Sequence, residues 1–400
     1  MILASEGIPC HIQSWSDKIC QHSLGCAIRD GRGSYEEKTH SNSPSVNFKH
    51  RSLYPTRFAY TMFAMEGMSS HMGESTGVST PMDNHPTSKF VASPSRTAKN
   101  IVYHAYTLIL FTCDNLKDVV IPPAVFGVLA TLSGPALDLP SQDGLAVLQR
   151  VPATLTWFWL MLLPCCLQNQ RHESSLQEDT INKPWRPIPT GRINTAQTTH
   201  LMIAAYLVLA LICYHLNVVP MYVAWVVFNT LYHDMGGSDY SGISRNAICA
   251  LGLICPFSGA LSIALGPDTT MSYAAWQWVL LVTFGIIGTT IHAQDFRDEA
   301  GDRARGRRTI PIELGRQRAL WTVVVAVIFW TVYVPLIFLG AHWVAAVVPV
   351  CLGGILVGTA MRAVGIQDGK LDRQMYKLWC LWTCSFGGLP LLATVFPLRT

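Results

Sequence analysis

The sequence predicts an all-α integral membrane protein with about nine transmembrane helices, and its composition is the first observation behind that class. Only 14% of the 400 residues are charged, whereas 50% are hydrophobic, and the mean hydropathy is +0.28. Soluble chains carry roughly 25% charged residues, so a soluble fold is not expected. The formal net charge of +4 is too small to indicate a nucleic-acid partner, and none is expected. The twelve cysteines form no C-x-x-C pair, which argues against a zinc site or a disulfide framework.

The second observation is a set of long apolar segments. A spanning helix needs about 20 mostly apolar residues, and the chain beyond its first hundred residues is divided into segments close to that length. The nine predicted spans lie near residues 118–135, 151–168, 200–216, 217–233, 246–266, 274–293, 319–340, 342–363 and 376–396. Residues 1–99 have no sustained apolar period, so we expect a disordered cytosolic N-terminal tail there and a membrane domain over residues 100–400.

The third observation is the position of the charges in the membrane domain. Most of them fall in four short stretches, at residues 171–192, 234–245, 295–318 and 362–377. An even number of predicted spans separates each stretch from the next, so all four are expected on one side of the membrane. They hold 16 Lys or Arg residues, whereas the opposite connections hold only Arg150. By the positive-inside rule this side is cytosolic, and we expect a multi-pass protein of the endoplasmic reticulum with its charged loops in the cytosol.

The third charged stretch opens with three aspartates at helical spacing. Asp295, Asp298 and Asp302 are three and four residues apart, so on a helix that leaves the membrane they share one face. Such carboxylates repel each other unless a cation neutralises them, and Mg²⁺ typically bridges one or two carboxylates to substrate phosphates. Arginines follow, including Arg307, and planar guanidinium groups bind phosphate oxygens in pairs. This stretch therefore predicts a site for Mg²⁺ and a diphosphate.

The first charged stretch repeats that arrangement in a weaker form. Glu178 and Asp179 precede Lys183 and the tetrapeptide R-P-I-P that begins at Arg186, and the later stretch ends in R-T-I-P. The two cores are four predicted spans apart, as expected for a degenerate internal repeat whose acidic ends face each other. The stretch between them contributes Arg245, its only cation, after paired glycines.

Both stretches resemble the aspartate-rich motifs of the UbiA superfamily of intramembrane prenyltransferases. The resemblance rests on D-F-R-D-E-A-G-D-R-A-R-G-R-R-T-I-P from Asp295 and on N-K-P-W-R-P-I-P-T-G-R from Asn182. It implies a nine-helix bundle in which the motifs hold Mg²⁺ and an isoprenoid diphosphate over a lipid-facing cavity. The first motif departs from the usual N-D-x-x-D-x-x-x-D form, because His172 and Ser175 occupy two aspartate positions. An N-Q pair at Asn169 and a later E-D pair stand there instead, which is similar to the fungal UbiA-type terpene cyclases.

The charge pattern and the resemblance together give each candidate residue a role. The predicted catalytic residues are Asp179, Asp295, Asp298 and Asp302. The predicted metal ligands are Asn169, Glu178, Asp179, Asp295, Asp298 and Asp302. The predicted diphosphate-binding residues are Lys183, Arg186, Arg245 and Arg307, with Arg192, Arg303 and Arg308 as runners-up.

The resemblance implies a membrane-bound terpene cyclase that ionises farnesyl or geranylgeranyl diphosphate with Mg²⁺ and cyclises it. Its expected partners are the prenyl diphosphate and the lipid bilayer, and no protein partner is inferred. The near alternative is a UbiA-type prenyltransferase, which uses the same ionisation but passes the prenyl group to an aromatic or lipid acceptor. The distant alternative is a non-enzymatic transporter, although transporters usually place ionisable groups near the bilayer midplane rather than at one face.

Overall fold

The computed structural model describes residues 96–397, and the regular secondary structure of this part of the chain is helical apart from one isolated bridge between Ala341 and Pro397. The predicted tail, residues 1–99, lies outside the described residues except for its last four. In chain order the elements are α2 (Arg96–Asn115), η1 (Leu116–Val120), α3 (Ile121–Leu132), η2 (Gly134–Leu137), α4 (Gly144–Gln170), α5 (Glu173–Asn182), α6 (Thr195–His215), α7 (Val219–Asn229), η3 (Thr230–Asp234), α8 (Gly237–Tyr240), α9 (Gly242–Leu265), α10 (Tyr273–Leu280), η4 (Leu281–Ile287), α11 (Gly288–Thr290), η5 (Ile291–Gln294), α12 (Asp295–Arg305), α13 (Ile310–Leu314), α14 (Arg316–Val332), η6 (Tyr333–Phe338), α15 (Trp343–Val364), α16 (Gly369–Phe386) and α17 (Leu389–Val395). The elements η2 and η5 are 3₁₀-helices, and the other η elements are π-helices.

Among the described residues, six helical segments are long and apolar enough to cross a membrane. They are α4, α6, α9, the run from α10 to α12, α14 with η6, and α15. A seventh is α16 with α17, if this pair, bent by 47°, counts as one span. The two other predicted spans, near 118–135 and 217–233, contain the shorter helices α3, of 12 residues, and α7, of 11. The all-α class is therefore confirmed, whereas the count of nine spans is not.

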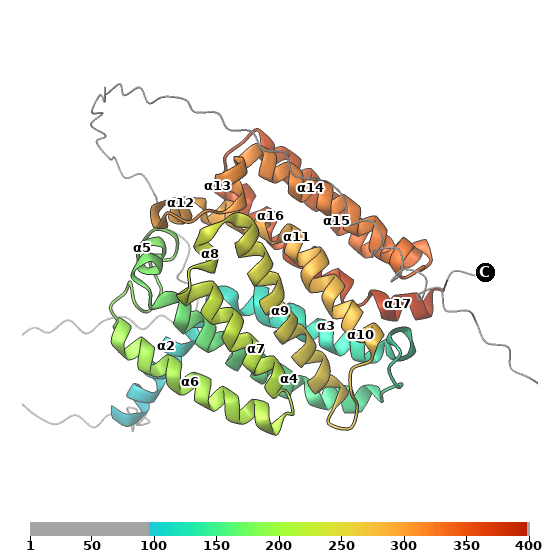
Figure 1. The fold of residues 1–400 in the computed structure, drawn as a ribbon, viewed down its shortest axis with the longest axis horizontal. Coiled ribbons are helices and arrows are strands. Elements are labelled where there is room, and N and C mark those ends of the chain that lie inside the picture. The colour runs from blue at the N-terminus through green and yellow to red at the C-terminus, as the bar shows by residue number, and fades with distance from the viewer. Residues whose placement is uncertain (1–95, 398–400) are drawn as a thin grey trace, which may run out of the picture. The chain divides into compact units, whose positions relative to one another are not determined.

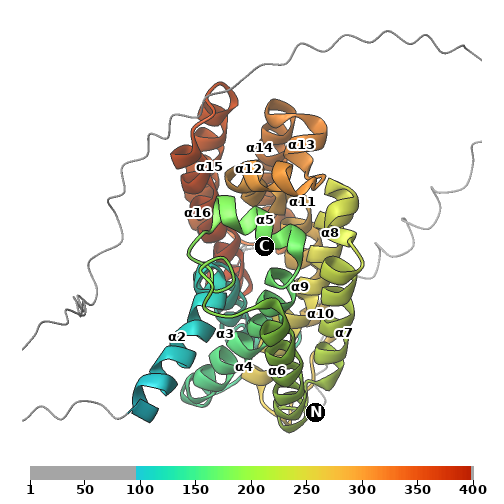
Figure 2. The same ribbon diagram turned by 90° about the vertical axis from the view of Figure 1, so that its left-hand side faces the viewer.

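The charged stretches lie together at one end of the bundle, where α5, α8, α12 and α13 gather in both ribbon views (Figures 1 and 2). Arg305 of α12 links its own stretch to two others, through Nη1 to Glu178 Oε2 at 3.2 Å and through Nη2 to Asp239 Oδ2 at 3.0 Å. The start of α14 is joined to α16 by Arg316 and Asp372 at 2.6 Å. These ion pairs bring all four stretches to one end of the bundle, as expected for loops on one side of the membrane.

Arg150, the cation predicted on the opposite side, lies near the start of α4. Its Nη1 donates to the backbone carbonyls of Ala264 and Leu265 at 3.0 and 2.9 Å. These carbonyls belong to the last turn of α9, where helices leave acceptors without an intrahelical partner. Arg150 therefore caps a helix.

Side-chain caps define the starts of the helices around the charged end. Ser241 begins α9 by accepting from the backbone N–H of Ser244 at 3.0 Å. Asn194 and Gln197 form a reciprocal capping box at the start of α6. Each cap satisfies donors that the first helical turn would leave unpaired, so these polar residues determine where α6 and α9 emerge.

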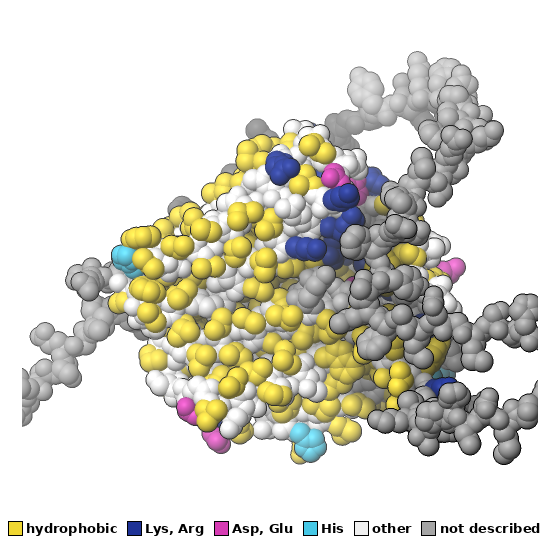
Figure 3. All heavy atoms as spheres, turned by 180° about the vertical axis from the view of Figure 1, so that it is seen from behind, with side chains coloured by type: hydrophobic (Ala, Val, Ile, Leu, Met, Phe, Trp, Pro, Cys, Tyr) yellow, Lys and Arg dark blue, Asp and Glu magenta, His cyan; other side chains and the backbone are white. Residues whose placement is uncertain are grey.

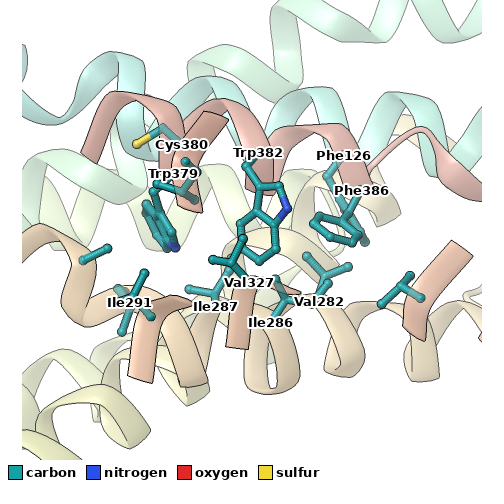
Figure 4. Packing of buried hydrophobic residues seen from close by; sticks show 14 of the residues in the cluster. Phe126, Val282, Ile286, Ile287, Ile291, Val327, Trp379, Cys380, Trp382 and Phe386 are labelled. Carbon is teal, nitrogen blue, oxygen red and sulfur yellow. The ribbon is translucent and has the colours of Figure 1, made fainter. Parts of the chain in front are cut away.

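Tryptophans of α16 form the centre of the larger core (Figure 4). Trp382 and Phe386 are fully buried, with rings edge to face at 5.0 Å. The indole N–H of Trp382 donates to Thr331 Oγ1 at 2.9 Å, and that of Trp379 to Thr290 Oγ1 at the same distance. These bonds satisfy the polar atom of each ring, so both tryptophans pack inside the bundle at little desolvation cost.

The outer helices present apolar side chains outward. Only 22% of the most apolar window of α6 is buried inside the protein. The corresponding share for α14 with η6 is 39%. Leu211 of α6 and Ile337 of η6 are each 65% exposed. Figure 3 shows a broad area of such side chains, with most of the visible Lys and Arg gathered near one edge of it. This surface suits a lipid environment.

Glycines bring α3 and α4 against α9. A Cβ added at Gly127 would lie 2.7 Å from the backbone carbon of Ala260, and one at Gly259 would lie 2.2 Å from the ring of Trp157. No L-residue side chain fits at such distances. Small residues of this kind let helix backbones approach closely where lipid offers no hydrophobic driving force between helices.

We expect Gly259→Ala to lower the free energy of unfolding by about 2 kcal/mol, because the new methyl group displaces a fully buried Trp157. The matched control is Gly354→Ala in α15, where a Cβ meets nothing within 4 Å. There the substitution should stabilise by up to about 1 kcal/mol through helix propensity. Thermal unfolding in detergent measures both, and equal melting temperatures would contradict the close contact between α4 and α9.

Candidate active site

A cavity of about 240 Å³ opens at the charged end and runs between α3, α4, α9 and α16. Its polar wall contains seven of the ten predicted site residues, namely Asn169, Glu178, Lys183, Arg186, Arg245, Asp298 and Arg307. Its remaining walls are largely apolar and aromatic. The sequence therefore predicted most of the polar wall, and the other three residues, Asp179, Asp295 and Asp302, lie behind it.

Each aspartate behind the wall holds an arginine of the wall. Asp179 accepts from Arg186 Nη1 at 2.8 and 2.9 Å, and Asp302 Oδ1 accepts from Arg307 Nη1 at 2.9 Å. The third pair is Arg245 with Asp295. In each ion pair the two side chains come from different turns or helices, so the pair fixes the guanidinium group in place.

Arg245 connects α9 to α12. Its Nη2 donates to Asp295 Oδ1 at 2.8 Å, its Nε lies 3.3 Å from the same oxygen, and its Nη1 donates to the hydroxyl of Tyr232. Asp295 is fully buried, and Arg245 is 7% exposed. A buried carboxylate and guanidinium are tolerated because each compensates the other's lost hydration.

The second predicted motif forms a helix, α12, as its spacing indicated. Of its three aspartates only Asp298 lines the cavity, with its Oδ2 atom 3.7 Å from Lys183 Nζ. Asn182 Nδ2 donates to the backbone carbonyl of Asp298 at 3.0 Å. The two predicted motifs therefore meet directly, as an internal repeat with facing acidic ends requires.

The two cores of the degenerate repeat are not structurally equivalent at the arginine that the sequence alignment pairs with Arg186. R-P-I-P and R-T-I-P match Arg186 to Arg308, yet Arg308 is exposed and pairs with Glu313 at 2.9 Å. Arg307 binds the motif aspartate instead. Of the other runners-up, Arg192 lies over the ring of Tyr103 at 4.1 Å. Arg303 pairs with Glu299 at 2.7 Å, and neither Arg192, Arg303 nor Arg308 lines the cavity.

The sequence analysis missed Arg297, which lines the cavity, and two charged residues beside the cavity wall, Arg305 and Asp239. The side chain of Arg305 is 2% exposed, and its Nη1 donates to Ser175 Oγ at 2.6 Å beside its ion pairs with Glu178 and Asp239. Asp239 also accepts from Arg307 Nε at 2.9 Å. Although burial alone would raise the pKa of Asp239, these two arginines hold it below its ordinary value. The position of Asp239 in a charged stretch was the available signal, but the spacing of the charged residues did not indicate its partners.

The first motif has replaced carboxylates by residues with other partners. Asn169 Oδ1 accepts from the hydroxyl of Ser175 at 3.3 Å. His172 Nε2 lies 2.7 Å from Asp234 Oδ1, which also binds Arg171. The positions that resemble the family's missing aspartates thus take part in contacts with Arg305 and Asp234, and neither adds a negative charge.

The pKa values of the first ion pair reflect its burial. Burial raises the pKa of Asp179 by more than the guanidinium of Arg186 lowers it. Burial would lower the pKa of Arg186, but the groups around it, Asp179 foremost, together raise that pKa above its ordinary value. Both residues are less than 5% exposed, so desolvation is the main cause for the carboxyl group.

The oxygen ligands of the wall suit a magnesium ion that is shared with a phosphate. Within residues 96–397 no three His, Cys, Asp or Glu side chains converge on a ready metal site. Mg²⁺ usually needs only one or two carboxylates when phosphates complete its shell. Asn169, Glu178 and Asp298 line the same cavity, and Asp302 Oδ2 is buried without a hydrogen-bond partner. This donor set fits Mg²⁺ held jointly by protein and diphosphate.

Fold and site define a multi-pass α-helical membrane protein whose cavity has a charged mouth and an apolar body. The chain belongs to the UbiA prenyltransferase family, whose model matches residues 120–381. The resemblance predicted from the two motifs is therefore confirmed.

Relatives similar to this chain include two terpene synthases. It is 28% identical to somaliensene A/B synthase of Streptomyces somaliensis over 282 residues, 69% of this chain and 88% of that protein. It is 30% identical to fumagillin beta-trans-bergamotene synthase of Aspergillus fumigatus over 269 residues, 64% and 88% of the two chains. Among solved structures, a UbiA homolog from Archaeoglobus fulgidus bound to DMAPP and Mg²⁺ matches with a TM-score of 0.49 and 12% identity, over 72% of this chain and 99% of that one.

Proposed function

We propose that this protein is a membrane-bound terpene cyclase that ionises farnesyl or geranylgeranyl diphosphate with Mg²⁺ and cyclises the hydrocarbon. The observation that carries this proposal is one cavity that combines a mouth of fixed guanidinium groups and carboxylates with an apolar, aromatic body. A prenyl diphosphate has the same two parts. Family membership and the terpene synthases among the relatives support the same reaction class.

The cations of the mouth would hold the diphosphate and stabilise the charge that develops when the C1–O bond breaks. Arg186, Arg245 and Arg307 are fixed by the carboxylates behind them, so they need little reorganisation during the reaction. Lys183 stands beside Asp298 at the same wall. Bound Mg²⁺ would neutralise diphosphate charge and favour its departure.

Asn169, Glu178 and Asp298 would hold the metal from the cavity side. Asp302 has a free carboxylate oxygen for the same purpose. Asp179 and Asp295 remain predicted ligands, and in the conformation described here they hold arginines.

The body of the cavity would keep the allylic cation away from water. Trp225, Phe228 and Tyr232 line one side, and Tyr376 and Trp379 line another. Aromatic faces attract cations by about 1–2 kcal/mol, and more where water is excluded. An ionised chain held there can react with its own double bonds.

Transfer of the prenyl group to an aromatic or lipid acceptor is the second candidate. The family name favours transfer, and the charged mouth of the cavity would serve transfer as well as cyclisation. The first motif argues against it. His172 and Ser175 replace two aspartates of the transferase pattern and are bound to Asp234 and Arg305. The transporter alternative is weakened by the position of the charges, which gather at one end of the bundle.

We expect purified protein in detergent to convert farnesyl or geranylgeranyl diphosphate to hydrocarbon with Mg²⁺ and no acceptor. Gas chromatography detects the product, and a diphosphate-release assay gives the rate. EDTA should abolish both signals. If turnover begins only after a phenol or quinone precursor is added, transfer is the function.

We also propose that the charged end faces the cytosol at the endoplasmic reticulum, with residues 1–99 as a cytosolic tail. The cations of that end support this orientation by the positive-inside rule. In the connections predicted at the other end, the one Lys or Arg is Arg150.

A further inference from the structure

Helix α9 lines the cavity along its length, so positions along α9 indicate the depth of the cavity. Arg245 stands at the mouth, and Cys249, Gly252 and Phe257 follow on the same wall. With a rise of 1.5 Å per residue, Gly252 lies about 10 Å and Phe257 about 18 Å below Arg245 along the helix axis. The wall therefore provides a scale against which a prenyl chain can be compared.

Two phenylalanines form the floor of the cavity. The rings of Phe126 on α3 and Phe257 on α9 meet edge to face at 5.0 Å, and both are less than 5% exposed. Directly beyond them Gly127 brings α3 into backbone contact with Ala260 of α9. On α16, Gly387 also lines the cavity, and a Cβ there would lie 3.2 Å from Phe126 Cα. The cavity therefore ends at these rings, because the helices close on each other below them.

The depth above this floor matches three isoprene units. Carbon–carbon bonds of about 1.5 Å at tetrahedral angles give an extended isoprene unit a length of about 5 Å. A contact distance of about 4 Å to the Phe257 ring leaves about 14–15 Å of the 18 Å. An extended farnesyl chain fills that length, whereas a geranylgeranyl chain exceeds it by about one unit.

Resting on the function proposed above, we infer that the Phe126–Phe257 floor selects farnesyl diphosphate over geranylgeranyl diphosphate. One extra methylene in a hydrophobic pocket typically changes kcat/KM by about 10- to 200-fold, and an isoprene unit is larger than a methylene. The wild-type protein should therefore use farnesyl diphosphate at least about tenfold better than geranylgeranyl diphosphate.

Gly252 offers a change in the opposite direction. A Cβ at this position would meet only ordinary contacts, with Phe228 Cβ at 3.5 Å and Trp225 at 3.9 Å. Gly252→Leu can therefore extend into the chain path without displacing a helix. At that depth the remaining space suits two isoprene units.

The test measures diphosphate release with Mg²⁺ from geranyl, farnesyl and geranylgeranyl diphosphate. Phe257→Ala and Phe126→Ala should each raise the geranylgeranyl-to-farnesyl ratio of kcat/KM by about tenfold or more. Gly252→Leu should lower farnesyl turnover by about tenfold while geranyl turnover is retained. Phe158→Ala is the matched control, because Phe158 is as buried but does not line the cavity.

Two failures can be distinguished. If the wild-type protein releases diphosphate from none of the three substrates, the proposed function is wrong and this inference falls with it. If wild type turns over geranylgeranyl diphosphate as fast as farnesyl diphosphate, the floor does not select chain length. The inference is also wrong if both folded floor variants keep the wild-type geranylgeranyl-to-farnesyl ratio of kcat/KM and Gly252→Leu keeps the wild-type farnesyl turnover.

Discussion

Asp298→Asn is expected to lower the rate of diphosphate release by about 10²–10³-fold, which is the usual effect of removing one preorganised electrostatic group from an active site. Asp298 is the motif aspartate that faces the cavity, and asparagine keeps its shape while removing the charge. The loss should come with a higher Mg²⁺ requirement, because one carboxylate ligand is gone. Initial rates over a Mg²⁺ titration measure both effects.

The control for Asp298→Asn is Asp372→Asn. Asp372 is a buried aspartate at the same end of the bundle, held by Arg316 at 2.6 Å, and it does not line the cavity. Its substitution should lower the melting temperature, since it leaves Arg316 unpaired, and should leave the rate and Mg²⁺ dependence unchanged below that temperature. Equal losses of rate in both variants would mean that Asp298 acts through stability.

Much of the helix arrangement could be predicted from the sequence because it depends on properties that each segment carries by itself. A helix occupies each of the nine predicted segments within residues 100–397. The number of full spans depends on more than composition. Pro122 and Pro123 occupy the first turn of α3, where they lack the N–H groups needed to continue a helix from α2. The π-helix η1 separates the two, and α3 is left with 12 residues.

The composition of the charged mouth was predictable, but its pairings were not. Spacing placed Asp295, Asp298 and Asp302 on one helix, and it could not show which of them faces the cavity. That depends on the rotation of α12 against α5 and α9, which is determined by contacts such as Asn182 with Asp298. The choice of Arg307 over Arg308 has a similar cause. Gly306 takes a left-handed conformation, with φ of 76°, and turns the chain between Asp302 and Arg307.

The apolar part of the site was the least predictable. The aromatic residues of the spans have similar local patterns whether they face lipid, core or cavity. Phe257 faces the cavity because α3 and α9 touch at Gly127, a contact between segments far apart in the chain. Only the assembled bundle identifies such residues.

Arg245→Met is expected to cost about 3–5 kcal/mol of unfolding free energy, because it leaves the fully buried carboxylate of Asp295 without its partner. The double variant Arg245→Met, Asp295→Leu removes both charges, so it should recover most of that loss. The hydroxyl of Tyr232 then lacks its bond to Arg245, which leaves a residual cost of about 1–3 kcal/mol. Reversible denaturation in mixed micelles measures these values.

Activity should not follow stability in this series. Arg245 lines the mouth of the cavity and would bind the departing diphosphate, so the double variant should fold and still lose about 10²-fold or more in diphosphate release. Destabilisation that is additive in the double variant would show that Arg245 and Asp295 do not stabilise the fold as a pair. Turnover at the wild-type rate would remove Arg245 from the diphosphate site. A folded double variant without turnover is expected, because the proposed diphosphate site includes Arg245 and the same buried ion pair joins α9 to α12.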